Sequence, residues 1–341
     1  MWQPDRGIIA ALLRITEAGD GFRVKRDSGL SLAWRRVADW VGPLVALLVM
    51  GAALSFAARD FLTGDNLANV ARQAAVIAIL AVAETIVIIG GGIDLSVGSV
   101  TALTGVTAAV VMSRGTPAAI AAACLAGILC GLACGAISGL LTAYGRMPSF
   151  IATLGMMGIA RGVAFVVTAG QNVTLPAAFP EFAAAEALGI PVPALVAAVV
   201  AVAAHILLSR TVPGRHTYAI GGNAEAARLS GIPVKRVVTI LFALSGLLSG
   251  IAGLVLTSRL TIGQPTAGQG YELDAIAAAV IGGASLMGGQ GTIPGTAVGA
   301  AIIGVLRNGL NLLNVEVFWQ QVAIGVIIIA AVFFDQFRRR R

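Results

Sequence analysis

Residues 214–233 read GRHTYAIGGNAEAARLSGIP, a polar island between two long apolar stretches, and this interruption decides how the chain folds. Asn223 is a good helix N-cap, because its side-chain oxygen can accept a hydrogen bond from a free backbone N–H. Ala224–Ser230 is a run of helix-forming residues. Gly231 fits the position that ends a helix, and Pro233 blocks continuation. The island therefore predicts a short, capped helix outside the bilayer.

Glu225 and Arg228 lie three residues apart on this helix, a spacing at which opposite charges pair. Further basic residues flank the island: Arg210, Arg215, Lys235 and Arg236. A short capped helix on the water side of a membrane protein usually serves to touch a partner. A surface loop that happens to coil is the other interpretation.

The composition is that of an integral membrane protein. Of 341 residues 57% are hydrophobic and only 11% are charged, against roughly 25% charged in soluble domains. The apolar segments are long and continuous, whereas a β-barrel would show short alternating ones, so the fold class is all-α. The charged first 40 residues carry no cleavable signal peptide. The basic residues behind the net charge of +7 flank apolar segments, which indicates membrane lipid and not nucleic acid.

About ten transmembrane helices are predicted, since a span needs about 20 residues. The eighth is short and interrupted by glycine, so nine or eleven spans stay open. The ten segments are 41–58, 68–90, 95–113, 117–143, 149–169, 192–209, 236–257, 272–287, 293–313 and 316–335.

Positive charge predicts the orientation. An even number of spans puts both termini on one side, and that side then holds 17 of the 23 Lys and Arg residues, against 4 on the other. Cytoplasmic segments carry this excess, so both termini and the loop 210–236 are expected inside. The expected organisation is a cytoplasmic lead-in (1–40), a transmembrane domain (41–337) and a basic cytoplasmic tail (338–341).

Two glycine-rich breaks interrupt the apolar pattern, GGGIDLSVG at 90–98 and IGGASLMGGQGT at 281–292. Asp94 and Ser96 can cap the helix that follows the first break. Interrupted helices in the two halves of a chain are typical of a transporter pathway. Tight re-entrant turns with no further role are the alternative.

Among the charged residues within predicted spans, Glu84, Arg161 and Arg307 look the most costly. Because a charge at the membrane centre costs a few kcal/mol, each should face the bundle or a water-filled cavity. Glu84 and Arg161 could pair; buried ion pairs or snorkelling are the structural alternatives. The candidates for a translocation path are Glu84, Asp94, Ser96, Arg161, Ser285 and Asn308.

No catalytic or metal site is predicted. Cys124, Cys130 and Cys134 share one apolar segment without His, Asp or Glu, which indicates packing. LMGGQ at 286–290 is similar to the signature loop of ABC ATPases. However, the sequence contains no GxxxxGK[ST] phosphate loop, so we expect no ATP hydrolysis by this chain and no cofactor in it.

Four segments together resemble the permease subunit of bacterial ABC sugar importers, closest to the ribose type. They are GGIDLSVGS (91–99), YAIGGNAEAARLSGI (218–232), QPTAGQGYELDAIAAAVIGG (264–283) and GTIPGTAVGAAIIGVLRNGLNLL (291–313). Their order and spacing match as well, and the resemblance covers residues 40–337. It implies an inner-membrane dimer of subunits with about ten helices each. It also implies a cytoplasmic ATPase subunit that binds ATP and Mg, and an extracytoplasmic sugar-binding protein.

By this resemblance the island contains the coupling helix that sits in a groove of the ATPase. Its residues are Asn223, Ala224, Glu225, Ala226, Ala227, Arg228, Leu229, Ser230 and Gly231. The small alanines would permit close approach. Ribose leads among the pentoses and hexoses as the solute, which would cross by alternating access. From another class, an ion-coupled secondary transporter would use Glu84 and Asp94 as ion sites and would need no ATPase.

Overall fold

A computed structural model describes residues 29–112 and 115–339, so the expectations for 1–28 and 340–341 lie outside the described residues. The chain divides into two compact units, Met1–Ala38 and Asp39–Arg341. Of the first unit, residues 29–38 are described and are helical.

The regular secondary structure of the described part is helical apart from four two-residue strands. In chain order the elements are α2 (Gly29–Ala57), α3 (Gly64–Ile89), α4 (Val97–Val111), α5 (Pro117–Ala143), α6 (Ser149–Thr168), β1 (Val173–Thr174), α7 (Pro180–Ala184), β2 (Glu186–Ala187), β3 (Ile190–Pro191), α8 (Val192–Arg210), α9 (Val212–Gly222), α10 (Ala224–Leu229), α11 (Val234–Leu260), β4 (Ile262–Gly263), α12 (Tyr271–Ile281), α13 (Ile293–Leu312) and α14 (Val317–Arg339).

Each predicted span overlaps a helix, but α2 begins at Gly29, before the predicted start at 41, and the eighth span is wrong in extent. The prediction ran over 272–287, whereas α12 ends at Ile281. Gly283 has a φ of +91°, which glycine adopts readily and other residues do not, so the helix cannot continue through it. Among the described residues six helices are long and apolar enough to cross a membrane: α3, α5, α6, α8, α11 and α13. Shorter apolar helices cover 41–57, 97–111 and 317–327.

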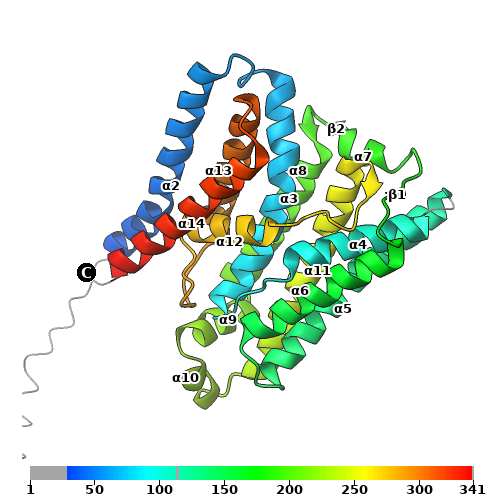
Figure 1. Ribbon diagram of the computed structural model, residues 1–341. Helices are drawn as coiled ribbons and strands as arrows, with labels where there is room; N and C mark the ends of the chain where they lie inside the picture. Colours follow the sequence, from blue (N-terminus) through cyan, green and yellow to red (C-terminus); the bar gives the residue numbers. More distant parts are fainter. Residues whose placement is uncertain (1–28, 113–114, 340–341) are drawn as a thin grey trace, which may run out of the picture. The chain divides into compact units, whose positions relative to one another are not determined.

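Helix α3 is the central element of the second unit. It packs against α8, α11, α12 and α13 (Figure 1), and nearly every residue from Ala75 to Ile89 is buried. Continuous burial explains why its second half, residues 75–89, reads as an almost unbroken apolar run. The helix is therefore enclosed by protein on most sides and has little contact left for lipid.

Glycines bring α5 and α11 into close contact, and α4 and α6 pack beside them (Figure 1). A methyl group at Gly135 would lie 2.9 Å from the Cα of Gly246, and one at Gly139 would lie 2.8 Å from the Cα of Thr239. Helices with small residues at the contact approach until their backbones touch, which is a common way of packing helices in membranes.

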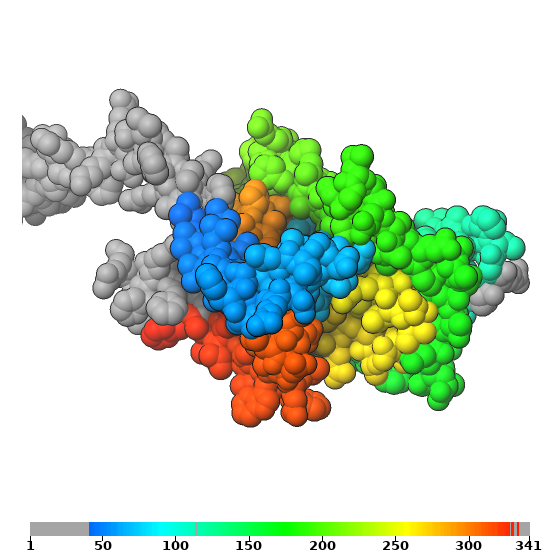
Figure 2. Space-filling model, turned by 90° about the horizontal axis from the view of Figure 1, so that it is seen from above, coloured from blue at the N-terminus to red at the C-terminus, as the bar shows by residue number. Residues whose placement is uncertain are grey.

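The polar connections gather at two ends of this unit. Figure 1 shows α9 and α10 at one end and β1, β2 and α7 at the other. At the second end β1 pairs antiparallel with β4, Val173 opposite Gly263, and β2 pairs with β3. Figure 2 looks onto this end, where the start of α3 (blue), the end of α11 (yellow) and the segment 173–191 (green) lie on the surface. The loop 210–236 is expected inside, and 170–191, which lies between the fifth and sixth predicted spans, then falls outside. The two segments lie at opposite ends, as those sides require.

Candidate functional site

The island forms two helices, where only one was predicted. The predicted helix is α10, and Asn223 caps it by accepting the N–H of Ala226 at 2.9 Å. Gly231 adopts the left-handed conformation, with a φ of +83°, and ends the helical turn as expected. Sequence reasoning missed α9, which Thr211 caps by accepting the N–H of Gly214 at 3.3 Å.

The outer face of α10 carries one ion pair. Arg228 and Glu225 approach to 2.6 Å, and more than 60% of each side chain is exposed. The hydrogen bonds that Arg228 donates lower the pKa of the Glu225 carboxyl, so both groups stay charged at neutral pH. Ala224 and Ala226 are exposed, whereas Ala227 is buried and packs into the core, so this third alanine is not free to face a partner. Leu229 is 73% exposed, which makes α10 a small surface with an apolar tip.

The first glycine-rich break holds a buried acidic cluster. Asp94 Oδ1 accepts the N–H of Ser96 at 3.0 Å and its O–H at 2.6 Å, and Asp94 Oδ2 accepts the O–H of Ser245 at 2.7 Å. The N–H of Asp94 donates to Glu84 Oε1 at 3.1 Å, and neither acid is more than 1% exposed. Asp94 therefore caps the turn into α4, whereas the Ser96 side chain caps no N–H of that helix, contrary to the prediction.

Arg161 and Arg307 have partners other than those considered from the sequence. Arg161 donates to the carbonyls of Pro265 and Ala267, at 2.6 and 2.9 Å, so the hypothetical Glu84 pair is not formed. Arg307 lies 2.6 Å from Asp274, which is 1% exposed.

Sequence reasoning did not single out Asp274. The available signal was an acidic residue in the apolar run of α12, for which a basic partner was to be sought on a neighbouring helix. The cation of Arg307 also stands 5.7 Å from the ring of Tyr271, at the start of the same helix.

Ser285 and Asn308 lie apart from the acidic cluster. The Ser285 hydroxyl accepts the N–H of Met287 at 3.2 Å and so shapes the second glycine-rich break. Asn308 exchanges two hydrogen bonds with Asn66, at 2.8 and 3.1 Å, and thereby joins α13 to α3. Of the six predicted path residues, the structure brings together Glu84, Asp94 and Ser96, while Arg161, Ser285 and Asn308 occupy separate places.

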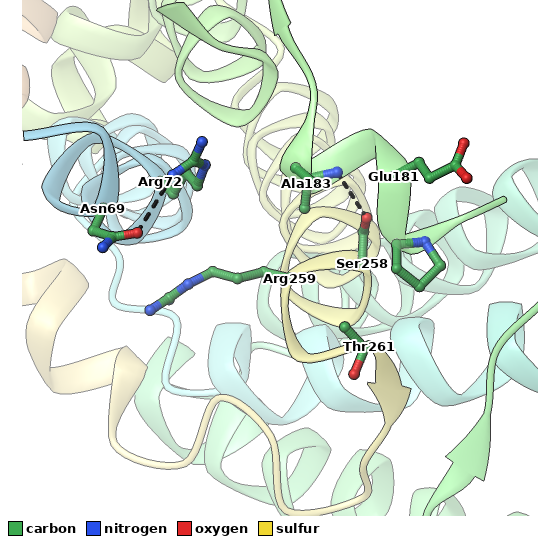
Figure 3. Close-up of a pocket in the computed structure, with 9 residues that line it drawn as sticks. Asn69, Arg72, Glu181, Ala183, Ser258, Arg259 and Thr261 are labelled. Atoms are coloured by element: carbon green, nitrogen blue, oxygen red, sulfur yellow. Dashed lines mark hydrogen bonds between the residues drawn. The ribbon is translucent and has the colours of Figure 1, made fainter. Parts of the chain in front are cut away.

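A pocket of about 620 Å³ opens at the end opposite α10 (Figure 3). Asn69 and Arg72 of α3 line one side, Glu181 of α7 another, and the Arg259 side chain extends from α11 toward α3. Arg72 pairs with Glu186 at 2.7 Å. The sequence does not reveal this pocket, because its lining comes from segments far apart in the chain.

A multi-pass helical bundle with interrupted helices, buried polar groups beside the breaks and a capped helix at one end defines the class of membrane permeases. The chain belongs to the family described as the branched-chain amino acid transport system / permease component, whose model matches residues 66–332. It is therefore a multi-pass membrane protein, as the apolar helices require.

Three relatives come from different bacteria. The ribose import permease protein RbsC of Haemophilus influenzae is 45% identical over 86% of this chain and 92% of its own length. RbsC of Bacillus subtilis is 47% identical over 87% of this chain and 92% of its own length. The L-arabinose transport system permease protein AraH of Escherichia coli is 40% identical over 91% of this chain and 94% of its own length. No solved structure matches the chain.

Proposed function

We propose that this chain is the membrane-spanning subunit of an ATP-driven importer for a monosaccharide, with ribose as the leading candidate. The observation that carries the proposal is 45–47% identity to ribose import permeases over 92% of their length. Relatives named for D-allose and L-arabinose follow at 38% and 40% identity. The chain itself performs no chemistry; ATP binding and hydrolysis belong to a separate subunit.

The assembly has three kinds of partner. An ATPase subunit docks on residues 223–231, a proposal supported by the exposed surface of α10. An extracytoplasmic binding protein delivers the sugar at the opposite end, and a second copy of the chain completes the pathway. This arrangement has ten spans, both termini in the cytoplasm, a lead-in of residues 1–40 and a basic tail of 338–341.

Transport follows from a difference in affinity. The ATPase must bind nucleotide better in one permease conformation than in the other, because equal affinity for both shifts no equilibrium. The sugar then passes along polar groups beside the helix breaks. We assign Glu84, Asp94, Ser96, Arg161, Ser285 and Asn308 to the path or to its gating, supported by the lipid-excluded position of the first three.

The test is sugar uptake by proteoliposomes that contain the chain with its ATPase and binding protein. Ribose, L-arabinose and D-allose are offered in turn, and each protein and ATP are omitted in turn. We expect uptake of one sugar, ribose first, only when all three proteins and ATP are present. Uptake by the chain alone under a proton or sodium gradient would overturn the proposal.

A further inference from the structure

The end of α9 packs backbone to backbone against both glycine-rich breaks. Gly221 lies so close to the carbonyl oxygen of Ile89 and the amide nitrogen of Gly289 that a methyl group on its Cα would overlap both. A methyl group at Gly288 would lie 2.7 Å from the Gly221 oxygen and 3.0 Å from the Cα of Gly91. Three segments that are far apart in the sequence therefore touch with no side chain between them.

Two hydrogen bonds fasten the same contact. The N–H of Gly289 donates to the carbonyl of Ile89 at 2.9 Å, which joins the second break to the end of α3. The Tyr218 hydroxyl donates to the carbonyl of Gly291 at 2.8 Å, which joins α9 to the residues that lead into α13. Gly288 and Gly289 have φ values of +84° and +71°, so this turn needs glycine for its backbone conformation as well as for space.

Asn223 alone separates α10 from α9, whose end makes this contact. The N–H of Asn223 donates to the carbonyl of Ala219 and ends α9, while its side chain caps α10. Helix α10 also packs on α9, and Ala227, which is 4% exposed, is its buried residue. Helix α10 and Gly221 are therefore joined both through the chain and through packing.

There is space beside the contact for a displacement of α10. A cavity of about 190 Å³ is lined by Gly90, Gly91 and Gly92 of the first break and by Ile220 and Ala224 of the island. Atoms already in contact transmit a push, because protein interiors are close-packed and compress little. The neighbouring cavity leaves space into which the island and the first break can move together.

We propose that Gly91, Gly221, Gly288 and Gly289 form a glycine joint that passes a displacement of α10 to the end of α3 and to the start of α13 in the same step. The proposal rests on the docking of an ATPase at α10. Because one residue, Gly221, touches both breaks, the two cannot respond separately. Added bulk at Gly221 would push the breaks away from the island and interrupt the transfer, while leaving the outer face of α10 unchanged.

The test compares two neighbouring glycines in the complete transporter with its ATPase and binding protein. Gly221→Ala places a methyl group on the backbone of both breaks, whereas Gly222→Ala is the matched control, because nothing lies within 4 Å of a Cβ there. The readouts are the amount of ATPase that copurifies, the rate of ATP hydrolysis and the sugar taken up per ATP. For Gly221→Ala we expect unchanged copurification and hydrolysis, with uptake per ATP lowered about tenfold. Gly222→Ala should match the wild type in all three.

A second variant, which disturbs the packing less, tests the proposal if Gly221→Ala does not fold. Tyr218→Phe removes the hydroxyl that reaches Gly291, and we expect uptake per ATP to fall about threefold with assembly unchanged. Uptake per ATP equal to that of the wild type in Tyr218→Phe, or in a folded Gly221→Ala, would overturn the proposal of a glycine joint. So would a parallel loss of hydrolysis, uptake and assembled complex, since that is the signature of packing alone. A wild-type chain that captures no ATPase would instead refute the proposed function.

Discussion

Asp274 and Arg307 form an ion pair between α12 and α13, where the carboxylate is 1% exposed. Removing one partner leaves the other charge buried and unpaired, which typically destabilises a protein by about 3–5 kcal/mol. We expect Arg307→Met to lower the thermal unfolding midpoint of the purified protein in detergent strongly. The double variant Asp274→Ala with Arg307→Met should recover part of that loss. A midpoint for Arg307→Met equal to that of the wild type would mean that the pairing contributes nothing.

Glu84 is fully buried, and its Oε1 accepts the N–H of Asp94. Glu84→Gln retains an acceptor for that hydrogen bond but removes the ionisable group. We expect uptake to fall by about tenfold, about 1.4 kcal/mol, with the thermal midpoint unchanged or raised, because an ionisable group is costly to place inside the membrane. Glu316→Gln makes the same chemical change at an exposed position and serves as the control. If both variants transport like the wild type, Glu84 has only a structural role.

At the scale of the element, the stability of α10 depends on its cap. Asn223 accepts the N–H of Ala226, and replacing such a cap by alanine costs about 1 kcal/mol of helix stability. We expect Asn223→Ala to speed amide hydrogen exchange in residues 224–229 and to weaken ATPase copurification. Asn223→Asp, which retains a capping oxygen, should exchange like the wild type. Unchanged exchange in the alanine variant would refute the assigned capping role.

The charged pair on the same helix tests coupling rather than folding. Glu225 and Arg228 are largely exposed and pair with each other. Replacing both by alanine should lower uptake per ATP severalfold, without loss of folded protein.

Because the pKa of Glu225 is lowered, the pair is intact above the ordinary pKa of a glutamate and is lost as the pH falls through the lowered value. Between pH 7.5 and about pH 5 we therefore expect ATPase copurification to show no titration of this pair. For the double alanine variant, uptake per ATP equal to that of the wild type would contradict a role of Glu225 and Arg228 in coupling.

For the whole molecule, the orientation can be measured by labelling cysteines from one side of the membrane. Leu188 and Leu229 are exposed at opposite ends, at 102% and 73%. With Cys124, Cys130 and Cys134 replaced by alanine, Leu188→Cys should react with an impermeant thiol reagent on intact spheroplasts. Leu229→Cys should react only after permeabilisation. The reverse pattern would invert the positive-inside assignment.

Hydropathy alone located ten helices, because burial in lipid or in the bundle demands long apolar runs whatever the partner. The end of α12 was missed because a positive φ at Gly283 is a backbone property that hydropathy does not carry. Helix α9 contains Pro213 and three glycines and is held by the buried side chains of Thr217 and Ile220. The packing of α9 outweighs the low helix propensity of its residues, and the sequence of one protein does not show that packing.

The site was predictable where its chemistry is local. The Asn223 cap and the Glu225–Arg228 pair involve residues three positions apart, and both were read correctly. The partner of Arg307 lies on another helix and depends on how α12 meets α13, so no spacing rule points to it. The pocket lined by Arg72 and Arg259 was missed for the same reason.

The enclosure of α3 has a consequence for how the protein is made. The helices that surround α3, which are α8 and α11–α13, begin at residue 192 or later, so they are not yet synthesised when α3 leaves the ribosome. Glu84 must then enter the bilayer without them, at about 3 kcal/mol for a charged side chain. Each Ile, Leu or Val nearby lowers the free energy of insertion by about 0.3–0.6 kcal/mol. The apolar run of residues 75–89 contains enough of these residues to offset the cost of Glu84. Helix α3 thus meets lipid during translation and protein afterwards, and its apolar residues serve both.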